Sequence, residues 1–191
     1  MKFIIERLEP ELYEWCVIEN EHISKIAGKD NVIFTNLGTN DIKKLEKYGH
    51  VFKKSISELK LDRICVLNQY AKKTLTSNDK NKFQYFVFGG ILCDHPAKKR
   101  TQQLIKKLEY SKIKFQTRNL GTKQMPTDVA VYVTKNILEG KKLKNFKFVD
   151  ELEIEVKENE SVTLPFRYVV EDKKVIISEK LVEYLRKRKE F

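Results

Sequence analysis

One stretch of the sequence places chemically capable groups directly after a short apolar run. In VFGGILCDHP, residues 87–96, two glycines follow the apolar residues, and Asp94 and His95 come within the next five positions. Glycines let a flat ligand approach the backbone amides closely, and an acid or an imidazole can accept a proton. The pattern predicts a ligand-binding loop at a strand end. The alternative is a tight turn, with Asp94 as a turn-forming residue and His95 as a hydrogen-bonded structural group.

A second loop of this kind is RNLGTKQMPTD, residues 118–128. Gly121 permits a turn, and Thr127 or Asp128 can cap a following helix and leave its first N–H groups facing a ligand. Because loops after neighbouring parallel strands open at one edge of a sheet, we expect one shared pocket. The sequence has no GxGxxG after its first strand and no GxxxxGK[ST], which disfavours a Rossmann dinucleotide site and a P-loop.

Glu19 is the acid that the pattern singles out. On a helix expected from residue 11, it lies at the centre of an apolar stripe formed by Leu12, Trp15, Cys16, Ile23 and Ile26. A carboxylate on the core side of a helix is costly unless it is paired, so Glu19 marks a candidate site. The alternative is a helix rim, where the acid reaches solvent or caps an amide.

The start of the chain is acidic, with six acids against two bases in the first 21 residues. This balance suits a basic peptide better than RNA. A solvated helix face remains the simpler explanation for the other acids of this helix, which are Glu11, Glu14 and Glu21.

Basic side chains supply further candidates. Arg100, Arg118 and Arg167 could bind a carboxylate or phosphate, and Arg118 is favoured; Lys98, Lys99 and Arg100, followed by Lys106 and Lys107, form the best patch for a ribosome. A solvated helix face is the alternative for that patch. The three histidines are scattered, without a cysteine or acid at ligand spacing, so no metal site is predicted.

These groups must be positioned by an α/β framework. Short β-rich segments at residues 3–5, 32–34, 64–67, 85–88 and 113–115 alternate with helical patterns at 11–27, 39–48, 98–109 and 127–139. That rhythm predicts a mostly parallel, doubly wound, Rossmann-like sheet. The segment VAVYV at 129–133 would also suit a strand, but start signals at Pro126, Thr127 and Asp128 favour a helix.

The pattern changes after residue 145. Residues 146–156, 162–170 and 174–178 predict antiparallel strands, and a helix capped by Ser178 closes the chain. With no linker-like stretch, we predict one domain over residues 1–191, in which residues 146–191 are a β-rich extension ending in a helix.

Composition sets the class of protein. Three widely spaced cysteines indicate reduced thiols, the acidic N-terminus is unlike a signal or transit peptide, and no apolar run reaches the roughly 18 residues of a membrane span. We therefore predict a cytosolic protein. Residues 81–150 carry 15 basic and 5 acidic side chains of a chain with net charge +11. This excess favours RNA or a ribonucleoprotein surface as partner, with solvated helix faces as the alternative.

The motifs together carry a family resemblance. VFGGILCDHP, KKRTQQL, LGTKQMPTD and LPFRYV, with the N-terminal MKFIIERLEPELYEWCVIEN, resemble the SPOUT-class methyltransferases that methylate an arginine of a small-subunit ribosomal protein. Members of this family are also described as predicted RNA methyltransferases. The resemblance covers the chain from its first residue to roughly residue 170. It implies an α/β fold with a C-terminal deep trefoil knot that binds S-adenosylmethionine.

Glu19 and Asp94, found from the residue pattern, are the catalytic candidates, and the basic residues Lys98, Lys99, Arg100 and Arg118 are the substrate-binding candidates. The resemblance implies a set of cofactor contacts. The cofactor would contact Leu67, Asn68, Phe88, Gly89, Gly90, Ile91, Leu92, His95, Pro96, Leu120, Gly121, Gln124, Met125 and Thr127. The sequence departs from the family pattern at Cys93, at Thr122 and at NQYA after residue 67; the last departure bears on the role of Asn68.

Three functions stay open at this point. A methyltransferase acting on a ribosomal-protein arginine leads, followed by an RNA methyltransferase of the same fold and by a non-catalytic module that binds during ribosome assembly. The partner would be a ribosomal protein or the ribosome, and the protein would be a monomer or a homodimer.

Overall fold

The fold is taken from a computed structural model, which describes residues 1–9, 11–89, 100–158 and 160–187. Its main sheet has six parallel strands in the order β3-β2-β1-β5-β4-β6. The strands are β1 (Lys2–Glu6), β2 (Val32–Thr35), β3 (His50–Val51), β4 (Ile64–Leu67), β5 (Tyr85–Gly89) and β6 (Phe115–Arg118). The predicted parallel sheet is therefore confirmed, with the short β3 as an addition.

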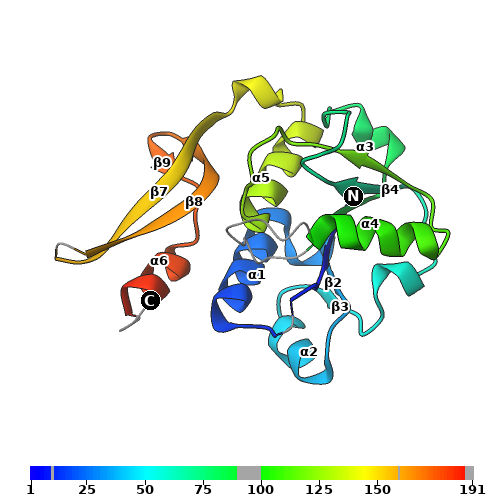
Figure 1. The fold of residues 1–191 in the computed structure, drawn as a ribbon, viewed down its shortest axis with the longest axis horizontal. Coiled ribbons are helices and arrows are strands. Elements are labelled where there is room, and N and C mark those ends of the chain that lie inside the picture. The colour runs from blue at the N-terminus through cyan, green and yellow to red at the C-terminus, as the bar shows by residue number, and fades with distance from the viewer. Residues whose placement is uncertain (10, 90–99, 159, 188–191) are drawn as a thin grey trace.

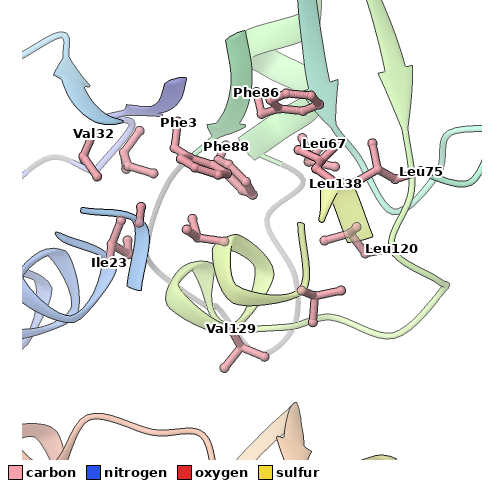
Figure 2. Packing of buried hydrophobic residues seen from close by; sticks show 14 of the residues in the cluster. Phe3, Ile23, Val32, Leu67, Leu75, Phe86, Phe88, Leu120, Val129 and Leu138 are labelled. Carbon is pink, nitrogen blue, oxygen red and sulfur yellow. The ribbon is translucent and has the colours of Figure 1, made fainter. Parts of the chain in front are cut away.

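Alternating side chains give this sheet two buried faces (Figure 1). Phe3 and Phe88 belong to the larger core cluster, together with residues of α1 (Glu14–Ala27) and α5 (Thr127–Leu138). Figure 2 shows Phe3 and Phe88 pointing from the sheet into this core. Ile4 and Val87 point to the opposite face, where they pack with α4 (Arg100–Tyr110). The sheet is thus doubly wound, as the apolar strand pattern predicts.

The predicted helix over VAVYV is confirmed as α5. Pro126 is its N-cap residue, and the Pro126 carbonyl accepts the first helical hydrogen bond from Ala130 N at 2.9 Å. Local start signals and the need for a crossover outweigh the β propensity of the valines here.

Several boundaries differ from the prediction. The strand predicted at 113–115 is observed as β6, because Lys112 turns the chain at φ 56° and Ile113 N–H still bonds to Leu108 O of α4. The first helix begins at Glu14 rather than residue 11. The remaining short helices are α2 (Thr39–Leu45), α3 (Asp79–Lys82) and the 3₁₀ turns Lys29–Asn31, Ile56–Glu58 and Leu143–Asn145.

A second, antiparallel sheet follows α5, as predicted for the C-terminal segment. It contains β7 (Lys147–Lys157), β8 (Glu160–Glu171) and β9 (Lys174–Val175), and α6 (Glu179–Lys187) follows it. Ser178 Oγ accepts a hydrogen bond from Leu181 N at 3.4 Å, in agreement with its predicted capping role.

This extension lies against the helices of the main unit (Figure 1). Arg167 N of β8 donates to Gln124 O at 2.9 Å, and Lys180 Nζ of α6 lies 2.6 Å from Glu21 Oε1 of α1. The antiparallel sheet therefore fixes the loop before α5. Among the described residues, no helix has the length and apolar character needed to cross a membrane.

Candidate active site

The predicted cofactor residues gather at the carboxyl edge of three neighbouring strands. β5, β4 and β6 are adjacent and parallel, so Gly89, Leu67 and Arg118 end at the same edge. Asn68 N donates to Arg118 O at 2.9 Å, and Asn68 Oδ1 accepts from Tyr70 N at 3.1 Å. Asn68 thus stabilises the turn after β4. Its predicted contact with the cofactor stays a prediction.

Asn119 ties two of these loops together, and sequence reasoning missed it. Its Nδ2 donates to Ala71 O at 2.7 Å, while its Oδ1 accepts from Gly121 N at 3.0 Å and Thr74 Oγ1 at 3.1 Å. One amide side chain therefore sets the spacing between the loops after β4 and β6. The signal in the sequence was its place in the glycine-containing loop of residues 118–128.

The two described glycines of the predicted site are constrained in different ways. A Cβ on Gly89 would lie 3.2 Å from the backbone and hydroxyl of Thr101, whose Oγ1 donates to Gly89 O at 3.3 Å. Gly121 has φ +96°, a conformation that L side chains rarely adopt. The turn that Gly121 was expected to permit is therefore present.

The remaining described loop residues vary in exposure. Leu67, Phe88 and Leu120 are buried within the main core cluster, Thr127 is buried, and Gln124 and Met125 are partly buried. The predictions for Gly90, Ile91, Leu92, Asp94, His95, Pro96, Lys98 and Lys99 lie outside the described residues. The strand ends and the 118–127 loop thus offer an apolar floor with backbone groups above it, which fits an adenosine-like ligand.

Glu19 lies where the core-side stripe places it, buried to 3 % exposure. Its Oε1 accepts hydrogen bonds from the first amides of α5, from Thr127 N at 2.9 Å and Asp128 N at 3.4 Å. One carboxylate therefore joins α1 to the end of the loop predicted to hold the cofactor. The alternative in which Glu19 lies at a helix rim and reaches solvent is wrong. The alternative in which it caps a backbone amide is observed.

The charge of Glu19 is strongly disfavoured. Burial, followed by the nearby carboxylate of Asp128, raises the pKa of Glu19 well above its usual range, although the two amide hydrogen bonds oppose this. Glu9 adds a smaller contribution of the same sign. Burial and the charges of Glu19 and Glu9 also raise the pKa of the Cys16 thiol to about 12. Glu9 and Asp128 therefore both disfavour a negative charge on the buried Glu19 side chain.

A cavity of about 300 Å³ opens beside these acids. Glu19 and Asp128 are its charged lining residues. The rest of the lining is apolar or aromatic and comes from α1, β8, α6 and the start of α5: Trp15, Pro126, Leu164, Phe166, Tyr168, Leu181, Tyr184 and Leu185. Two carboxylates within an aromatic wall suit a planar cation such as a guanidinium, which can hydrogen-bond to the acids and stack on the rings.

Asp128 and His22 form a pair that sequence reasoning did not find. His22 Nδ1 lies 2.7 Å from Asp128 Oδ2, and Asp128 Oδ1 accepts from Val129 N at 2.7 Å. The sequence suggested Asp128 only as a helix cap and treated His22 as isolated. Their separation of 106 residues hides the contact, since only the packing of α1 on α5 creates it.

The geometry of Arg118 disfavours its predicted substrate role. Arg118 is 4 % exposed, and its guanidinium bonds to Asp79 at 2.9 to 3.2 Å and lies over the Phe83 ring. Burial alone would raise the pKa of Asp79, but the hydrogen bonds from Arg118 and Thr76 lower it. The pair is a structural ion pair beneath the β6 end.

Two other basic candidates are also placed. Arg100 is partly buried at the start of α4, with Lys106 and Lys107 exposed further along that helix. Arg167 pairs with Asp150 at 2.6 Å and lies over Phe148. Across the described part of the chain, no group of three or more His, Cys, Asp or Glu residues could hold a metal ion.

Known proteins resemble this chain along its whole length. The profile of the family described as "Protein arginine N-methyltransferase SFM1-like" matches residues 2–190. "Protein arginine N-methyltransferase SFM1" of Saccharomyces cerevisiae is 36 % identical over 205 residues, which cover 98 % of this chain and 95 % of the yeast protein.

Solved structures agree with this likeness. The yeast arginine methyltransferase SFM1 complexed with SAM superposes with a TM-score of 0.86 at 35 % identity, covering 97 % of this chain and 90 % of that chain. Further structures of the yeast protein contain SAH or MTA. Trm10 of Thermococcus kodakaraensis shares the fold alone, with a TM-score of 0.60 at 18 % identity over 75 % of this chain and 95 % of that one. The predicted resemblance to protein arginine methyltransferases is confirmed: this chain belongs to the SFM1-like protein arginine N-methyltransferase family.

Proposed function

We propose that this protein transfers a methyl group from S-adenosylmethionine to an arginine side chain of a small-subunit ribosomal protein. The observation that carries the proposal is the adjacency of two sites. Glu19, which lines the acidic cavity, hydrogen-bonds to Thr127 N at the end of the predicted cofactor loop. A methyl donor in that loop would therefore lie next to a guanidinium in the cavity.

The residues at the sheet edge fit the cofactor. Gly121, where the nearest atom to an added Cβ is 4.0 Å away, and the strand end at Leu67 and Asn68 give a flat group close access to backbone amides, whereas the missing Cβ of Gly89 makes room for Thr101 of α4. Structures of the yeast relative with SAM, SAH and MTA support this assignment. When bound, the cofactor supplies a methyl group on a sulfonium centre, ready for in-line displacement.

The acceptor side follows from charge. An arginine guanidinium entering the cavity would meet Glu19 and Asp128, with the rings of Trp15 and Phe166 for stacking. During transfer a new N–C bond forms as the S–C bond breaks, and one guanidinium N–H proton must leave. Glu19 suits that role, because a bound guanidinium favours its ionised form, and a carboxylate whose pKa is raised by burial is a better proton acceptor than an ordinary glutamate.

A ribosomal target is supported by how charge is divided. The acidic cavity suits a basic peptide, whereas residues 81–150 carry the basic excess that suits RNA. Exposed Lys106 and Lys107 on α4 are part of that excess. A protein bound to RNA presents both partners at once, so the two surfaces fit one ribonucleoprotein target.

We further propose that the chain contains the trefoil knot that the family resemblance implies. The parallel order of β5, β4 and β6 and the fold shared with Trm10 support this proposal. Cytosolic location and a monomeric or homodimeric state stay predictions.

The test is a labelling experiment. Purified protein is incubated with ribosomes and isotopically labelled S-adenosylmethionine, and the products are divided between ribonuclease and protease treatment. We expect label that survives ribonuclease and is released by protease, with mass spectrometry placing it on one arginine. Label that follows the RNA would instead identify an RNA methyltransferase, and the absence of any label would leave a binding module.

A further inference from the structure

His22 is the side chain next to the acid pair that the chemistry above does not use. It lies three residues after Glu19 on α1, and its side chain is 17 % exposed, against 2 % for Asp128. Its Nδ1 approaches Asp128 Oδ2 to 2.7 Å. An ionised Asp128 carboxylate can only accept hydrogen bonds, and in that state Nδ1 of His22 is the donor.

The two acids of the cavity have different surroundings. Asp128 accepts hydrogen bonds from His22 and from Val129 N, so each of its oxygens has a donor. Glu19 has donors on Oε1, from Thr127 N and Asp128 N. Two close carboxylates in a buried site do not ionise equally. Burial and the neighbouring Asp128 carboxylate raise the pKa of Glu19, and both of its amide donors bond to one oxygen, so Glu19 is the acid of the pair whose charge is more strongly disfavoured.

Other titratable groups lie near Glu19 and Asp128. Glu9 adds negative charge, and Cys16 stays neutral because its pKa is raised to about 12. Tyr168 and Tyr184 line the cavity from β8 and α6. Lys180 of α6 is held by Glu21. His22 contributes its Nδ1 contact to Asp128 Oδ2 at 2.7 Å.

On the basis of the proposed function, we propose that His22 is a positioning residue for methyl transfer. Its Nδ1–H donates to Asp128, which anchors the acceptor guanidinium, and the bound cation favours the ionised form of Glu19, so that Glu19 can take up the departing proton. His22 itself neither touches the acceptor nor carries the proton. The imidazole donates from Nδ1 whether it is neutral or protonated, so its own titration does not control the reaction.

Two variants separate this role from others. His22→Asn places an amide N–H where Nδ1 lies, whereas His22→Leu has no donor of any kind. We expect His22→Leu to lower kcat/KM for the acceptor by about 10- to 100-fold, the size of a lost hydrogen bond to a charged group, and His22→Asn to stay within about threefold of the wild type. S-adenosylmethionine binding should be unchanged in both variants, and the acid limb of the pH profile should not shift in His22→Asn.

A double-variant comparison shows whether His22 acts through Asp128. In an Asp128→Asn background, His22→Leu should cause no further loss. The proposal is overturned if His22→Asn is as impaired as His22→Leu, because His22 would then carry the proton, or if neither variant is impaired.

A measurement on the wild-type protein covers the case in which a variant does not fold. Nitrogen-15 NMR of the His22 imidazole should show a protonated Nδ1 that changes in Asp128→Asn. A neutral ring protonated only at Nε2 would contradict the proposal. If the wild type labels no protein at all, the proposed function fails, while the NMR result still decides whether the His22 to Asp128 hydrogen bond exists.

Discussion

Two buried glutamates in this protein show why burial alone does not define an active site. Glu6 at the end of β1 is fully buried, and its carboxylate accepts hydrogen bonds from Thr35 Oγ1, Ser55 Oγ and Ile56 N. Glu19 is almost as buried but has two amide donors on one oxygen and lies beside a cavity. Glu6 is enclosed by hydrogen-bond donors, whereas Glu19 has a second carboxylate beside it and faces space for a ligand.

The difference identifies their tasks. Around Glu6 of β1, donors from β2 and from the start of the 3₁₀ turn at Ile56–Glu58 join three segments, so this acid stabilises the fold. Around Glu19, a neighbouring carboxylate takes the place of a further donor. A second acid at this position is costly for the free protein and is relieved by a cation.

The largest effect is expected for Glu19→Gln. The amide oxygen can still accept from Thr127 N, but the side chain can no longer accept a proton, so kcat should fall by about 100-fold or more. The melting temperature should not fall, because the variant removes a buried acid held near another. Methyl transfer and thermal unfolding are measured together, with the exposed Glu11→Gln as control. A fully active Glu19→Gln would remove the distinction between the two glutamates.

Arg118→Gln extends the comparison to a buried basic residue. Asp79 would keep its charge without its main partner, and the free energy of unfolding should fall by about 3–5 kcal/mol. Urea unfolding measures this loss. Replacing Arg118 and Asp79 together by leucine should recover much of it, because the pair is then removed as a unit. Unchanged stability with weaker substrate binding would restore the substrate role first predicted for Arg118.

Glu6→Ala tests the structural side of the comparison. Its loss leaves two hydroxyl groups and Ile56 N without their acceptor, so the free energy of unfolding should fall by about 2–3 kcal/mol. At a temperature where the variant is folded, kcat per folded molecule should equal that of the wild type. Reduced kcat in fully folded Glu6→Ala would place Glu6 in the reaction as well.

The smallest effect concerns how α6 is held against α1. Hydrogen bonds from Lys180, Lys25 and Tyr48 lower the pKa of Glu21 to about 2. Because the folded-state value is depressed, the stabilisation is present above about pH 4.5 and is lost as the pH falls toward 2. Melting curves of the wild type and Glu21→Gln should differ by a few degrees near pH 6 and converge near pH 2. A difference that does not vary with pH would contradict this.

Much of the framework could be predicted because its signals are local. Four β-rich runs became β1, β2, β4 and β5, and capping signals before residue 128 correctly favoured a helix over VAVYV. The fifth strand was misplaced because Ile113 is apolar yet belongs to the turn that closes α4. A hydrophobic residue at a helix end and one at a strand start look the same in sequence.

The candidate site could be predicted only in part. Glu19 stood out because its helix period places a charge on the core side, which is a local conflict. Tyr168, Tyr184 and the His22 to Asp128 pair could not be found, because segments far apart in sequence meet only when the antiparallel sheet and α6 dock on α1 and α5. The sequence also does not reveal that Asp79 faces Arg118.

The account depends most directly on the claim that the acidic cavity binds a guanidinium. Carbon-13 NMR can follow the Glu19 carboxyl through a pH titration, assigned by its absence in Glu19→Gln, with and without N-acetyl-L-arginine methylamide. We predict a pKa above the usual range in the free protein, as burial and Asp128 require, and a lower pKa when the arginine compound is bound. The citrulline analogue, which has no charge, should leave it unchanged. An ordinary pKa in the free protein, or the same titration with and without the arginine compound, would contradict the account.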